Sequence, residues 1–135
     1  MFQLLGLAWA SEPADRLEGL VKNLLAQQNA DGGWSQLANM KSDAYATGEA
    51  LFALHTAGRI PVSHSALERG RSFLLATQLE DGTWHVRRRA FPFQPTMKSG
   101  FPHGRDSWIS AAAASWAALA LSMQDDTRIA SSKQP

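Results

Sequence analysis

Four segments of the chain carry hydrophobic residues in patterns that predict helices. In residues 12–28 and 64–78 apolar positions alternate with polar and charged ones, which is typical of helices with one exposed side. In residues 106–123 small or apolar side chains occupy every face, which predicts a helix that is buried all round, and residues 43–57 are likewise expected to be more buried than the first two segments. The alternation of the two kinds predicts two layers of helices.

Composition points the same way. The chain has 22 Ala and 16 Leu but only three Val and three Ile among its 135 residues. Strands favour β-branched side chains, whereas helices favour Ala and Leu. The sequence therefore predicts an all-α fold with four main helices.

Short polar signals mark the ends of these helices. Asp43 and Asp106 are expected to cap the two buried helices, and Ser65 with Glu68 has the spacing of a capping box. Gly58, followed by Pro61, is expected to end the helix 43–57.

The strongest feature is an internal repeat. Residues 17–34 and 67–84, offset by 50 positions, are identical at nine of 18 positions. Each copy reads as a helix, a turn built on Asp-Gly, and a Trp that closes the turn. We divide residues 1–124 into units 11–60 and 61–124, followed by a polar tail, 125–135.

Residues 69–84 resemble the QW motif of squalene–hopene cyclases and the wider prenyltransferase repeat superfamily. The motif runs basic, Gly, spacer, aromatic-Leu, spacer, Gln, spacer, Gly-x-Trp. The first copy matches less completely, because Asn23 stands where the aromatic residue belongs and no basic-Gly pair opens it. The resemblance implies an α/α toroid of outer and inner helices, in which the motif residues are structural: Gln28, Gly32, Trp34, Gln78, Gly82 and Trp84.

Two helical pairs cannot close such a ring. Repeat arrays generally need about three units to bury a continuous core. We therefore expect a C-terminal segment of a larger toroid, in which residues 1–10 are the end of a preceding inner helix. The alternatives are self-association of the chain and, for residues 1–10, a signal peptide.

Several site classes find no support in the sequence. A formal net charge of +1 and the absence of Cys argue against a nucleic-acid partner, a thiolate metal site and a zinc site of the protein prenyltransferase kind. No cofactor motif occurs, and the four His lack the spacing of metal ligands. The longest apolar run, 109–123, is shorter than a transmembrane helix requires.

The segment 85–105 is the main irregularity. It holds five Lys or Arg, two His, three Phe and three Pro but no acid, and it is 13 residues longer than the matching connection of the first unit. One hypothesis is a lip that binds a phosphate or carboxylate through Arg87, Arg89 and Arg105, with His103 and Asp106 as a proton-transfer pair. The alternative is a loop that only wraps an incomplete helix layer.

The resemblance implies an apolar cavity lined from the inner helices. Its candidate lining residues are aromatic, and their π-faces would stabilise carbocations of a polyprenyl substrate: Tyr45, Phe52, Trp108 and Trp116. The acidic Asp-x-Asp-Asp string of these cyclases is absent, and Asp125-Asp126 follows a helix instead of opening one. We therefore keep two hypotheses: a cyclase-like segment that binds or cyclises a polyprenyl substrate, and a non-catalytic helical repeat for protein interaction or assembly.

Overall fold

The computed structural model describes residues 1–90 and 99–124, and within them every regular element is helical. The α-helices are α1 (Phe2–Trp9), α2 (Ala14–Ala26), α3 (Ala44–Thr56), α4 (Ser65–Thr77) and α5 (Ser107–Ser122), with a short 3₁₀ turn, η1 (Gly104–Asp106), before α5. The all-α prediction and the expected helices are confirmed, each helix to within two residues of its expected ends. Expectations about 91–98 and the tail 125–135 lie outside the described residues.

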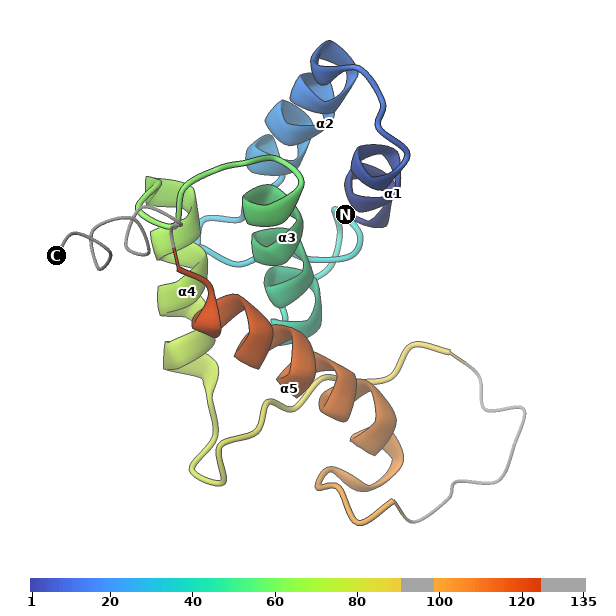
Figure 1. Cartoon of the computed structure of the whole chain (residues 1–135). Helices are drawn as coiled ribbons and strands as arrows, with labels where there is room; N and C mark the ends of the chain where they lie inside the picture. Colours follow the sequence, from blue (N-terminus) through green and yellow to red (C-terminus); the bar gives the residue numbers. More distant parts are fainter. Residues whose placement is uncertain (91–98, 125–135) are drawn as a thin grey trace, which may run out of the picture.

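Helix α3 stands at the centre of the molecule and contacts each of the other four α-helices (Figure 1). Nine of its 13 residues are buried. Its main neighbour is α5, and Gly48 allows the two backbones to approach closely. A methyl group at Gly48 would lie 2.6 Å from the carbonyl carbon of Trp116. A larger residue there would push the two inner helices apart.

Helix α5 departs from the prediction of burial on all sides. Six of its 16 residues are buried, while Trp108 is 56% exposed and Leu119 is 41% exposed. The prediction was wrong because an alanine-rich helix is apolar on every face whether or not a neighbour covers it. In the described residues α5 packs chiefly on α3, with its far side open.

The helix caps agree with the sequence at one of three positions. Asp43 caps α3 as predicted, because its Oδ1 accepts a hydrogen bond of 2.8 Å from the backbone N–H of Ala46. Helix α4 is capped by His64 instead of Ser65, since the imidazole Nδ1 accepts from the Ala66 N–H at 3.2 Å. Asp106 precedes α5 but makes no capping hydrogen bond to it, because its carboxylate is engaged elsewhere.

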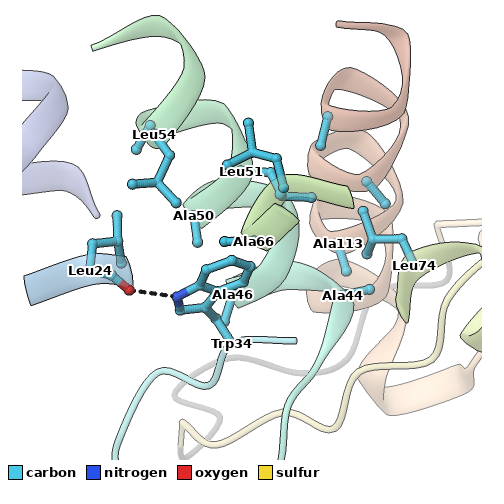
Figure 2. Close-up of a cluster of buried hydrophobic side chains, with 14 of the residues drawn as sticks. Leu24, Trp34, Ala44, Ala46, Ala50, Leu51, Leu54, Ala66, Leu74 and Ala113 are labelled. Atoms are coloured by element: carbon cyan, nitrogen blue, oxygen red, sulfur yellow. Dashed lines mark hydrogen bonds between the residues drawn. The ribbon is translucent and has the colours of Figure 1, made fainter. Parts of the chain in front are cut away.

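The two repeat corners have the same internal geometry. The indole N–H of Trp34 donates to the carbonyl of Leu24 at 2.8 Å (Figure 2), and that of Trp84 donates to the carbonyl of Leu74 at 2.8 Å. Both indoles are buried. The glycine of each turn has positive φ, +86° in the first copy and +80° in the second. Each Trp thus satisfies a carbonyl near the end of its own outer helix.

Among the described residues, none of the helices is both long and apolar enough to span a bilayer.

Candidate functional site

A cluster of aromatic side chains lies where α3, α5 and α1 meet. Tyr45, Glu49 and Phe52 share one face of α3 because they are four and three residues apart. The Phe52 ring lies 5.6 Å from the Trp116 ring of α5, and Phe2 of α1 meets the same indole edge-on at 6.3 Å. The rings of Phe52, Trp116 and Tyr45 are half-buried, so each still presents part of its surface outward. We call Phe2, Tyr45, Glu49, Phe52 and Trp116 the inner cluster.

Glu49 is the ionisable group of the inner cluster. It is only 3% exposed, an uncommon place for a carboxyl group. Burial raises its pKa from the ordinary 4.5 to about 6, because a charged carboxylate is poorly solvated there. The amino group of Met1 opposes this rise, and the negative charge of Asp43 adds to it. Glu49 therefore exchanges between neutral and charged forms close to neutral pH.

The phenol of Tyr45 responds to the same surroundings. Burial raises its pKa, the nearby charge of Glu49 raises it further, and a side-chain hydrogen bond with Trp116 opposes both. The tyrosine stays protonated, and the cluster combines aromatic π-faces with one carboxyl group. Such an arrangement attracts a cation that lies against the rings.

The structure brings together three of the four aromatic residues predicted to line a cavity. Tyr45, Phe52 and Trp116 belong to the inner cluster, whereas Trp108 points to the open side of α5. The sequence analysis missed Phe2 and Glu49. Glu49 is the lone acid within the helix 44–56, and that was the signal available in the sequence.

In the described part of the loop, the basic residues do not converge on one site. Arg89 forms hydrogen bonds with Gln36 and an ion pair with Asp43, so its charge is already neutralised. Arg87 and Arg105 are exposed, and neither makes a hydrogen bond or ion pair with the described residues. The described part of the loop therefore supports the wrapping alternative more than an assembled anion site.

The expected pairing of His103 with Asp106 is wrong. His85 is the partner of Asp106, with Nε2 2.9 Å from Oδ2, while His103 Nε2 lies 2.8 Å from the hydroxyl of Thr83. The two imidazoles stack with centroids 4.8 Å apart. Hydrogen bonds from His85 and from the backbone N–H of Arg88 lower the pKa of Asp106.

The lowered pKa makes Asp106 a poor proton donor. Its hydrogen bonds with His85 and Arg88 instead connect the first residues of the loop to the turn before α5. In residues 1–90 and 99–124 no group of acids and histidines is arranged to hold a metal ion.

Comparison with known proteins finds one matching family and two similar proteins. Residues 4–87 match the family described as the squalene–hopene cyclase N-terminal domain. A squalene–hopene cyclase of Bradyrhizobium diazoefficiens is 40% identical over 76 residues, which cover 48% of this chain and 11% of that protein. A lanosterol synthase of Candida albicans is 42% identical over 59 residues, which cover 44% of this chain and 8% of that protein. The matched part of the chain thus spans about a tenth of either relative.

The match also bears on the position of the segment in a toroid. The matching family is the N-terminal domain, whereas the sequence analysis expected a C-terminal segment. A repeat motif looks alike wherever it stands in an array, so the motif alone does not fix its place. Helix α5 and the described part of its preceding loop after residue 87 lie beyond the matched region.

Proposed function

This chain belongs to the squalene–hopene cyclase N-terminal domain family, and from that premise we propose that it forms part of the wall of a cavity that binds a polyprenyl chain. The observation that carries the proposal is the inner cluster. Four of its five residues lie on α3 and α5, which we assign to the inner layer of a toroid, and the rings of Tyr45, Phe52 and Trp116 are half-buried.

The chemistry of the cluster suits a hydrocarbon that develops positive charge. Phe52 and Trp116 offer π-faces, each worth about 1 kcal/mol for a partly desolvated cation. Glu49 adds a carboxylate on the same face of α3 once its proton leaves near pH 6. We assign this segment the binding and stabilisation of substrate, and we place the catalytic acid outside it.

The test compares a neutral isoprenoid with a cationic one that has the same farnesyl chain. Farnesol and N,N-dimethylfarnesylamine are titrated separately into the chain at pH 7.5, and binding is followed by isothermal calorimetry. We expect the amine to bind about fivefold more tightly, because one cation–π contact is worth about 1 kcal/mol. Trp116→Leu should weaken this preference, because one of the two π-faces is lost.

Trp9→Leu is the matched control. Trp9 is also an indole, but it is 77% exposed and lies at the end of α1, outside the cluster. The variant should keep the preference for the amine. Equal binding of both ligands by the unaltered chain, or loss of the preference in Trp9→Leu alone, would contradict the proposed function.

The second candidate function is a non-catalytic repeat for assembly. Large apolar side chains are exposed on α4, on the turn that follows it and on α5: Leu75, Leu79, Trp108 and Leu119. If neither isoprenoid binds while the chain still associates with other helices, this alternative replaces the first.

A further inference from the structure

Two imidazole rings lie face to face between the second repeat corner and the turn before α5. The rings of His85 and His103 are nearly parallel, at 15°, and their centroids are 4.8 Å apart. Phe101 meets the ring of His103 edge-on at 6.4 Å. His85 directly follows Trp84 of the corner, whereas His103 directly precedes η1. The pair therefore joins the two described ends of the loop 85–105.

Each imidazole is linked to a carboxylate through its Nε2 atom. His85 Nε2 lies 2.9 Å from Oδ2 of Asp106. The hydroxyl of Thr83 donates to Oδ1 of Asp81 at 2.7 Å, so its oxygen must accept the hydrogen bond of 2.8 Å from His103 Nε2. Hydrogen bonds lower the pKa of both acids, which therefore stay ionised and can only accept. Both rings thus carry their proton on Nε2 when they are neutral.

The other nitrogen of each ring is open to protonation. Among the residues that the structure describes, neither Nδ1 atom has a hydrogen-bond partner. Histidine is the side chain that ordinarily gains a proton between about pH 8 and pH 5. The first proton is favoured on His85, because its carboxylate partner is bonded directly, whereas His103 reaches its acid through a hydroxyl group.

A second proton on the pair is opposed by the first. It would place two positive rings face to face at 4.8 Å, a distance at which like charges at a protein surface repel each other. The charged groups that act on the cluster are Asp81 of the corner, Asp106 of η1 and Arg88 of the loop. Arg88 adds to the positive charge, and α5 carries no ionisable side chain.

His103 is the member of the pair that can be released. Its φ is +77°, in the left-handed region that residues other than glycine rarely adopt. Such a conformation persists where the surroundings impose it, and here the ring stack and the hydrogen bond to Thr83 do so. His85, by contrast, stands between the buried residues Trp84 and Val86.

We propose that His85 and His103 form a pH-operated clasp between the second repeat corner and η1. The clasp stays closed while the pair holds no more than one added proton, because the charged ring of His85 then pairs with Asp106 and lies against a neutral ring. A second proton opens it: His103 becomes charged, leaves the stack and gives up its hydrogen bond to Thr83.

The test follows the ring C–H signals of the histidines by NMR in the full 135-residue chain, between about pH 8 and pH 4.5. We expect His85 to gain its proton at a higher pH than His103. The nuclear Overhauser effects between the two rings should disappear during the second step. In His85→Gln, His103 should titrate at a pH about one unit higher, since the opposing charge is gone.

Asp106→Asn is a second variant that keeps both rings. It removes the charge that favours the first proton, so the two titrations should move closer together. His64→Gln is the matched control, because His64 caps α4 and is not part of the pair, and it should leave both titrations unchanged.

Three results would overturn the proposal. They are titration of both rings in one step, an unchanged titration of His103 in His85→Gln, and contacts between the rings that persist when both are charged. None of these measurements involves an isoprenoid or a residue of the inner cluster, so this proposal and the proposed function fail separately.

Discussion

Replacing Glu49 by Gln tests whether the inner cluster holds a carboxyl group at an energetic cost. The difference between a pKa of about 6 in the folded chain and the ordinary 4.5 corresponds to about 2 kcal/mol. Because this pKa is raised, the folded state binds more protons than the unfolded state between these two values. The stability of the natural chain should therefore fall as pH rises through about 6.

Glu49→Gln removes this dependence, since the amide does not ionise. Relative to the natural chain, the variant should gain about 2 kcal/mol between pH 4 and pH 8, whatever constant offset the substitution introduces. The free energy of unfolding is measured by urea denaturation at intervals across this range, with helix content followed by circular dichroism. Asp81 and Asp106, whose pKa values are lowered, affect stability only as the pH falls below the ordinary 3.8.

Glu18→Gln is the matched control for this series. Glu18 is an exposed carboxylate on α2 that pairs with Lys22, so its removal should change stability by less than about 0.5 kcal/mol at any of these pH values. A flat difference between Glu49→Gln and the natural chain from pH 4 to pH 8, or a difference of opposite sign, would refute the assignment of a raised pKa.

The remaining predictions concern the packing and ends of the helices. Gly48→Ala should destabilise the chain by about 1–3 kcal/mol, because the added methyl group meets the backbone of α5 at 2.6 Å. Gly19→Ala, also within a helix but with nothing within 4 Å of the new methyl group, should instead stabilise it by about 0.5–1 kcal/mol. Asp43→Ala should cost about 1 kcal/mol through the lost cap on Ala46, with further loss from its pair with Arg89. Thermal and urea unfolding measure the stability of all three variants. If Gly48→Ala were as stable as Gly19→Ala, α3 and α5 would not be closely packed.

The helices and the repeat corners could be predicted because their signals are local. Asp43 precedes its helix directly, and Asp-Gly fixes each turn within a few residues. Trp34 and Trp84 reach carbonyls ten residues earlier, a distance that the repeat itself preserves. For such features the sequence pattern and the structure describe the same short stretch of chain.

The candidate site was predicted only in part because it depends on distant neighbours. Nothing next to Glu49 in the sequence indicates that the fold leaves it only 3% exposed. Likewise, the loop contains two histidines, His85 and His103, and the sequence does not show which of them pairs with Asp106. In the structure the partner is His85. Helix composition also led to the wrong prediction for α5. An alanine-rich face can be covered by a neighbouring helix, but alanine does not require that a neighbour be present.

The side chain of Gln28 forms hydrogen bonds with Ala66 and Arg69 of α4, and this link has a consequence for synthesis. The two partners follow Gln28 by 38 and 41 residues, so they leave the ribosome well after the first corner has been made. During synthesis the first corner can therefore gain these two hydrogen bonds only after α4 has emerged, and until then the polar groups of Gln28 that make them are left to water.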